Sequence, residues 1–244
     1  MKFMVLLLIG EGSQAQATQT ELRRVVEQTL AVEDELVRRR KYVDSHRLRP
    51  ESEAVTIRMT PGGGQIVESG PYAGAGLRGY FIVESESIDE AVEWTRKFPL
   101  SARMRAEIRP IQAGNRISSY DITTAGRKRP KFLLIFCGSE ANWDAYSEKQ
   151  QREAVDKHNA IGAQLFAQQK FLDGSRLMPR SEAKTVSVKD GLQIVVDGPF
   201  AETKEVLGGY FLIESDSMEE AIEWGKKTTF GYGGTEVRQV WETE

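Results

Sequence analysis

The feature that most constrains this chain is that it contains the same pattern twice. Tyr80–Trp94 read YFIVESESIDEAVEW and Tyr210–Trp224 read YFLIESDSMEEAIEW, so 9 of 15 positions are identical at a shift of 130 residues. The apolar runs that follow Lys2 and Lys131 match at a shift of 129. A repeat of this length indicates a duplicated globular domain, because solenoid units are about 20–50 residues long.

The repeat predicts two domains, which we place at 1–112 and 131–244. Residues 113–130 lack any periodic apolar pattern and are the expected linker. Each half is long enough to bury a hydrophobic core, although a domain of this size leaves much of its surface exposed.

Charge and composition exclude several classes of protein. With 33 basic and 36 acidic side chains, the net charge of −3 gives no support for binding nucleic acid. Cys137 is the single cysteine, which excludes an internal disulfide and fits a reducing, cytoplasmic compartment. No run approaches the roughly 20 apolar residues of a membrane span. The apolar run at Phe3–Ile9 recurs in mid-chain, so it indicates a strand rather than a signal peptide.

Each half begins with such a strand, at Phe3–Ile9 and at Phe132–Cys137. Capping boxes follow at Thr18 with Glu21 and at Ser147 with Gln150, and each predicts the start of a helix. The inward stripes of these two helices are predicted at Val25, Thr29, Val32 and Leu36, and at Ala154, His158, Ile161 and Leu165.

The rest of the second half indicates strands and one more helix. Ala183–Val188 and Leu192–Val196 are predicted strands joined by a hairpin turn, and Gly209–Glu214 is a third. Ser217–Lys227 is predicted as a helix with a serine cap, and Thr235–Trp241 as a closing strand. The order β-α-β-β-α-β with an extra hairpin predicts an α+β fold, a ferredoxin-like split βαβ sandwich in each half.

A ferredoxin-like sheet carries both helices on one face, so its other apolar face needs a cover. We expect the two sheets to pack face to face within one chain as a pseudo-dimer. A further homodimer is compatible with this arrangement.

The candidate site comes from a difference between the two copies. His158 and Asp197 are titratable, whereas the matching positions of the first half hold Thr29 and Ser69. A His–Asp pair is a proton-transfer unit, because the carboxylate fixes the imidazole tautomer and leaves one nitrogen free as base or acid. His158 and Asp197 are therefore the candidate catalytic pair. Their alternative interpretations are a core histidine and a turn-forming aspartate.

A charged loop beside Asp197 completes the candidate site. The expected substrate-binding residues are Phe200, Glu202, Thr203, Lys204 and Tyr210. The first half has Gly74-Ala75-Gly76 in place of the charged residues, and a solvated hairpin is the alternative interpretation. Pro61–Gly64 lacks the Lys-Ser/Thr of a phosphate-binding loop and is predicted to be a turn. His46 has no Cys or His nearby, so no metal site is expected, and no cofactor is indicated.

The segment DGPFAETKE (Asp197–Glu205), with LGGYFLIES and the EAIEW helix after it, resembles the YCII-related or DGPF-domain family. The resemblance covers 131–242, and a degenerate form covers 1–112. It implies ferredoxin-like α+β barrels that pair sheet to sheet, with a His–Asp site at His158 and Asp197. The first half departs from the family pattern at its histidine, its aspartate and its shortened loop, so no site is transferred to it.

Two functions remain open. Relatives of the resembled family include a dehydrochlorinase acting on chlorinated aromatic-ring intermediates, and the wider superfamily includes muconolactone isomerases. The resemblance therefore implies a lyase- or isomerase-type enzyme acting on a small molecule such as a lactone or chlorinated ring-cleavage product. Other members accompany extracytoplasmic-function sigma factors, which implies a non-catalytic ligand-binding or regulatory module with a sigma-factor partner. Fold alone does not decide between them.

Overall fold

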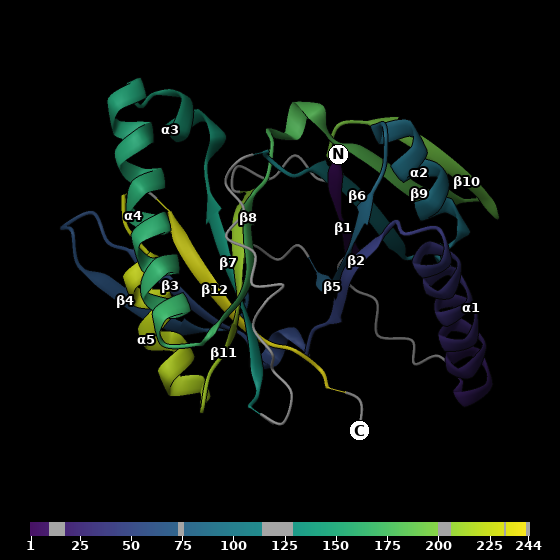
Figure 1. Cartoon of the computed structure of the whole chain (residues 1–244), viewed down its shortest axis with the longest axis horizontal. Helices are drawn as coiled ribbons and strands as arrows, with labels where there is room; N and C mark the ends of the chain where they lie inside the picture. Colours follow the sequence, from purple (N-terminus) through teal and green to yellow (C-terminus); the bar gives the residue numbers. More distant parts are fainter. Residues whose placement is uncertain (10–17, 73–75, 114–128, 200–205, 232, 243–244) are drawn as a thin grey trace. The chain divides into compact units, whose positions relative to one another are not determined.

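The structure is a computed structural model that describes residues 1–9, 18–72, 76–113, 129–199, 206–231 and 233–242 (Figure 1). In the first repeat the elements are β1 (Lys2–Ile9), α1 (Gln19–Arg38), β2 (Tyr42–Arg47), the short 3-10 helix η1 (Glu51–Glu53), β3 (Val55–Met59), β4 (Gln65–Ser69), β5 (Leu77–Glu84), α2 (Ile88–Lys97) and β6 (Met104–Pro110). In the second they are β7 (Lys131–Gly138), α3 (Glu140–Asp144), α4 (Glu148–Ala167), β8 (Phe171–Arg176), η2 (Arg180–Glu182), β9 (Lys184–Lys189), β10 (Leu192–Asp197), β11 (Val206–Glu214), α5 (Met218–Thr228) and β12 (Gly234–Gln239).

The chain forms two compact units, and each unit contains a hairpin from the other repeat. Unit 1 comprises Met1–Arg47, Ala75–Ile111 and Met178–Glu202, and unit 2 comprises Leu48–Gly74, Gln112–Leu177 and Thr203–Glu244. The ranges 1–112 and 131–244 thus follow the sequence repeat, whereas the compact units exchange the hairpins β3–β4 and β9–β10. The α+β class and the ferredoxin-like order of elements agree with the prediction from the sequence.

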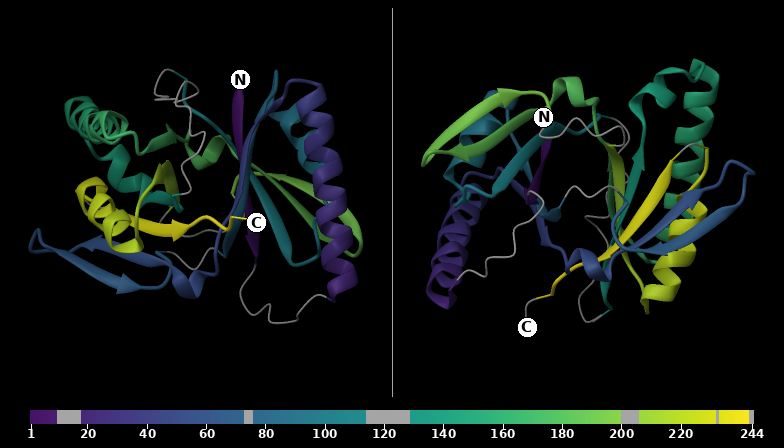
Figure 2. Two further views of the ribbon diagram at one scale, coloured as in Figure 1. Left: turned by 60° about the horizontal axis from the view of Figure 1, so that its bottom comes forward. Right: turned by 180° about the vertical axis from the view of Figure 1, so that it is seen from behind.

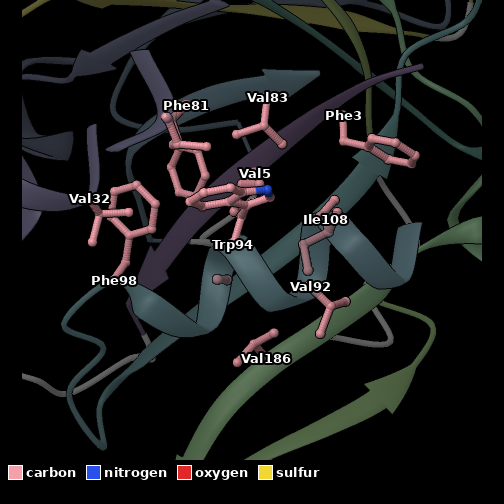
Figure 3. Close-up of a cluster of buried hydrophobic side chains, with 13 residues drawn as sticks. Phe3, Val5, Val32, Phe81, Val83, Val92, Trp94, Phe98, Ile108 and Val186 are labelled. Atoms are coloured by element: carbon pink, nitrogen blue, oxygen red, sulfur yellow. The ribbon is translucent and has the colours of Figure 1, made fainter. Parts of the chain in front are cut away.

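The sheet of unit 1 has the strand order β10-β9-β6-β1-β5-β2. Strand β9 of the second repeat pairs with β6 in antiparallel register, from Arg105 opposite Ser187 to Ile108 opposite Lys184. Helices α1 and α2 bury their apolar sides in one core with this sheet. Figure 3 shows Val186 of the exchanged β9 pointing into the same cluster as Trp94 and Ile108. The incoming hairpin therefore supplies part of the core of unit 1.

Unit 2 repeats this arrangement, with the strand order β4-β3-β12-β7-β11-β8. Strand β3 of the first repeat pairs with β12, from Gly234 opposite Arg58 to Val237 opposite Val55. In the two views of Figure 2 the β3–β4 hairpin continues the sheet beyond β12, and α4 and α5 lie together over one face. Ile57 of β3 is fully buried in the core with Leu165 and Trp224.

Matched buried ion pairs anchor the start of both exchanged segments. In unit 1, Arg109 contacts Glu107 at 3.2 Å and donates a hydrogen bond to the carbonyl of Met178. In unit 2, Arg238 contacts Glu236 at 2.9 Å and donates to the carbonyl of Arg49. Both guanidinium groups are almost fully buried, where charges are tolerated only when they are paired and hydrogen-bonded.

Glu236 also holds the segment that leaves the hairpin of unit 2. Its carboxylate accepts a hydrogen bond of 2.8 Å from the backbone amide of Tyr72. The Tyr72 ring lies under the guanidinium of Arg58 and against Gly234, where a Cβ atom would be 2.1 Å from the ring. Tyr72 belongs to the SGPY segment that corresponds to the DGPF motif, so the aromatic residue of this motif is a packing residue in unit 2.

The predicted elements are confirmed with small shifts at their ends. Both capping boxes are present, and the turn between β9 and β10 places Asp190 and Gly191 at positive φ. The inward stripe of α1 is shorter than predicted, because Val25 is exposed and only Val32 and Leu36 reach the core. Strands β2 and β8 and helix α3 were not located from the sequence. Within the described residues, no helix is both long and apolar enough to cross a membrane.

Candidate functional site

The candidate site is in unit 2, where α4 places His158 against the sheet. The Ser147 capping box starts this helix, and Ile161 and Leu165 bury its inward stripe. His158 lies one turn before Ile161 on the same stripe. Its ring centroid is 4.6 Å from that of Phe136 on β7 and 4.5 Å from that of Phe230, which follows α5.

The two nitrogens of His158 have different environments. Nδ1 lies 3.0 Å from the carbonyl oxygen of Ala154, one turn earlier in α4. A carbonyl can only accept, so Nδ1 carries the hydrogen and the neutral ring has its lone pair on Nε2. Nε2 is buried and has no partner at full hydrogen-bond geometry in the described part of the protein, although the Thr228 carbonyl lies near enough to the ring to favour its charged form. The side chain therefore presents a basic nitrogen inside an aromatic enclosure.

The surroundings lower the pKa of His158 below its usual value of 6.5. Burial is the main cause, because a charged imidazolium loses solvation there. The carbonyls of Ala154 and Thr228 oppose this effect, and the positive charge of Arg176 adds to it. A neighbouring carboxylate would have raised this pKa, but burial dominates and the charge that acts on the ring is the cation Arg176.

Arg176 ends β8 on the same face of the sheet as His158. Its guanidinium carbon lies 4.0 Å from the centre of the Trp143 ring, which α3 provides. Gly209 of β11 pairs with Arg176 on one side and with Phe136 on the other. Arg176 is half-buried, and burial lowers its pKa, yet none of the described carboxylates forms an ion pair with it. Arg176, Gly209, Phe136 and His158 thus form one continuous patch of unit 2.

The structure places Asp197 in a different unit from His158. It lies in β10 of unit 1, with an 89% exposed side chain, and accepts a hydrogen bond of 3.0 Å from Lys184. Lys184 also pairs with Asp89 at 3.3 Å. These carboxylates raise the pKa of Lys184, with Asp197 the larger contributor. Because the hairpins are exchanged, unit 2 has Ser69 at the position that Asp197 occupies in unit 1.

Of the five expected substrate-binding residues, Tyr210 is the one that lies within the described part of the protein. Phe200, Glu202, Thr203 and Lys204 lie outside the described residues. Tyr210 is fully buried, and its hydroxyl donates a hydrogen bond of 2.8 Å to Asp173. Tyr210 alternates with Phe211, which belongs to the helix-side core, so its side chain is on the opposite face of the sheet from His158.

Sequence reasoning missed two groups of interest. The first group is Arg176 with Trp143. The repeat aligns Arg176 with Arg47 and could have drawn attention to it, whereas no repeated residue marks helix α3 and Trp143. The second group is a His–Asp pair in unit 1, where His46 Nε2 lies 3.2 Å from Asp44 Oδ2 on β2.

Metal ions have no evident site, because no three His, Cys, Asp or Glu side chains of the described ranges gather to hold one.

The fold and this patch define an α+β protein of ferredoxin-like type with a half-buried histidine of lowered pKa beside an arginine. Residues 133–244 match the YCII-related domain. The chain is also 30% identical over 95 residues to an uncharacterised protein of Rhizobium meliloti (strain 1021), covering 39% of this chain and 77% of that one. The chain belongs to the YCII-related family.

Solved structures offer more distant similarities. A chlorite dismutase from Candidatus Nitrospira defluvii has a TM-score of 0.43 at 7% identity, covering 99% of this chain and 90% of that one. A candidate chlorite dismutase has a TM-score of 0.41 at 9% identity, with 99% and 94% covered. Neither similarity assigns an activity to this chain. A YCII-related domain with this patch fits a small-molecule enzyme or a ligand-binding module.

Proposed function

We propose that this protein is a small-molecule enzyme of the lyase or isomerase type in which His158 acts as the general base. The observation that carries the proposal is the unpartnered, buried Nε2 of a ring whose other nitrogen is fixed by the Ala154 carbonyl. A base is most effective when it is unprotonated at the working pH and close to the proton it takes. The lowered pKa of His158 meets the first condition.

In the proposed reaction, Nε2 removes a proton from a carbon of the substrate. The electron pair of that C–H bond then forms a new double bond, either with loss of a leaving group or with return of the proton at another carbon. The Ala154 carbonyl favours the imidazolium in this step, because it continues to accept the Nδ1 hydrogen. Lactones and chlorinated ring-cleavage products are suitable candidates, because both contain acidified C–H bonds.

Asp197 stays a prediction as the partner of His158. Its contacts with Lys184 and its exposure in unit 1 support a local ion pair, and Nδ1 already has an acceptor. The mechanism above therefore does not depend on it. The substrate contacts of Phe200, Glu202, Thr203 and Lys204 are likewise predictions.

The test is a comparison of His158→Ala with Thr29→Ala, the matched position of the first repeat, on a substrate found by screening lactones and chlorinated ring-cleavage products. We expect His158→Ala to lower kcat by about 10²–10⁴ while the melting temperature stays near that of the parent. Thr29→Ala should leave kcat unchanged. Full turnover by His158→Ala would exclude the general-base role.

A ligand-binding module without catalysis is the second candidate. It is favoured because no second titratable side chain is hydrogen-bonded to His158 among the residues that the structure describes. Such a module could act with an extracytoplasmic-function sigma factor, which co-purification from the native cell would test. Ligand binding without turnover across the whole screen would support this candidate over the enzyme.

A further inference from the structure

Arg176 is a half-buried cation of the candidate site, and no carboxylate of the described residues pairs with it. A half-buried guanidinium is costly unless a partner or an aromatic face compensates for its lost solvation. Here the Trp143 ring, whose centre lies 4.0 Å from the guanidinium carbon, provides the aromatic face. Most other buried or half-buried cations of unit 2 do have a carboxylate partner, including Lys170 with Glu220 and Arg238 with Glu236.

The register of the sheet places this cation beside His158. Arg176 and Phe136 flank Gly209 in adjacent strands, so a residue without a side chain separates them. Adjacent strands are about 4.8 Å apart, so the backbone of Arg176 is about two strand spacings from that of Phe136. The Phe136 ring packs against the ring of His158. A small ligand bound by the guanidinium would therefore lie on the same face of the sheet as His158. Phe136, Phe230 and Trp143 make the rest of the surroundings apolar and aromatic.

We propose that Arg176, held against Trp143, binds a carboxylate of the ligand, so that the site takes small carboxylic acids with an apolar or aromatic body. A guanidinium matches the two oxygens of a carboxylate with two parallel hydrogen bonds, which orients the ligand as well as attracting it. The inference rests on the proposed function of the His158 site, since it names the class of ligand for that same site.

In unit 1 the residues that match this site are only partly the same. Its matching residues are Arg47, which is exposed, Leu7 in place of Phe136 and Thr29 in place of His158. Arg47 is therefore a matched control for Arg176. It has the same residue type at the end of the equivalent strand, and the positions that match Phe136 and His158 hold Leu7 and Thr29.

The experiment is calorimetric titration of the full-length protein with sodium benzoate and with benzamide, its neutral isostere, at constant ionic strength. We expect benzoate to bind and benzamide to bind at least about tenfold more weakly. Arg176→Ala should weaken benzoate binding by about 10–100-fold, Arg176→Lys should weaken it less, and Arg47→Ala should not change it. Lysine retains the positive charge but lacks the planar guanidinium. Arg176→Lys is therefore also the more conservative variant, which keeps the test valid if Arg176→Ala fails to fold.

A second readout is the NMR titration of His158. Bound benzoate should raise the pKa of His158, because it places a negative charge beside the ring. Equal binding of benzoate and benzamide, no binding of benzoate at all, or unchanged affinity in a folded Arg176→Ala variant would each overturn the proposal. These outcomes are independent of catalysis. Loss of benzoate binding in Arg176→Ala together with full turnover in His158→Ala would retain the anion site and reject the general base.

Discussion

At the scale of single residues, burial rather than pairing determines the chemistry of His158. The ring is enclosed by Phe136 and Phe230 with one nitrogen satisfied and one unsatisfied. A satisfied core histidine would have both nitrogens paired, because an unpaired buried polar atom costs about 1–3 kcal/mol. The Thr228 carbonyl offsets part of this cost, and the lack of a partner at full hydrogen-bond geometry is the physical reason to regard Nε2 as a functional atom.

The lowered pKa makes a prediction about stability and pH. The unfolded chain binds a proton on His158 below its usual pKa of 6.5, whereas the folded protein resists it. The free energy of unfolding should therefore have its full His158 contribution above pH 6.5 and lose it as the pH falls through the lowered folded value. Urea denaturation between pH 5 and 8 should show this loss in the parent protein and not in His158→Phe. A variant with the same pH dependence as the parent would contradict it.

At the scale of elements, the exchanged hairpins are held by buried ion pairs. Removing one partner of such a pair leaves an uncompensated buried charge. Arg238→Leu should therefore lower the free energy of unfolding by about 3–5 kcal/mol, because it leaves the Glu236 carboxylate without its cation and the Arg49 carbonyl without its donor. Urea denaturation measures the change.

The matched control for that prediction is an exposed pair. Lys149 and Glu153 are 3.9 Å apart on the surface of α4, and Lys149→Ala should cost at most about 1 kcal/mol. The double variant Glu236→Leu with Arg238→Leu should be less destabilised than Arg238→Leu alone. If all three variants had similar stability, the ion pair would not be anchoring the hairpin.

Packing of α5 on the exchanged strand β3 gives a separate prediction. A Cβ atom at Gly225 would lie 2.6 Å from Ile57 Cδ1 and 3.0 Å from Val237 Cγ2. Gly225→Ala should therefore destabilise the protein by about 1–3 kcal/mol through overpacking. Gly62→Ala is the control, because nothing lies within 4 Å of its added Cβ. Thermal melts of both variants measure the difference, and an unchanged melting temperature for Gly225→Ala would show that β3 can move away.

At the scale of the whole molecule, the exchange makes each unit depend on both repeats. Strand β6 pairs with β9, and β12 pairs with β3, so both sheets contain strands from each half. Cleavage at a protease site inserted between residues 113 and 130 should therefore leave the two fragments associated on size-exclusion chromatography. Elution as two separate fragments would contradict the exchanged units and support the contiguous domains 1–112 and 131–244.

The amino-acid sequence by itself determined the α+β class and most of the elements, and its internal repeat predicts the duplication. The reason is that these depend on local signals: the capping boxes at Thr18 and Ser147, the Asp190-Gly191 turn, and apolar periodicity along each strand. It also singled out His158, because a polar residue interrupts an otherwise apolar helical stripe. The face-to-face packing of the two sheets stays a prediction.

The tertiary structure alone decided which residues share a unit. A repeat in the sequence cannot distinguish a hairpin that folds onto its own half from one that pairs with the other half, because both use the same local pattern. The choice depends on contacts distant in sequence, such as Arg109 with Met178 and Ile57 with Gly225. For the same reason the sequence grouped His158 with Asp197, whereas the fold puts it beside Arg176 and buries it among aromatic rings.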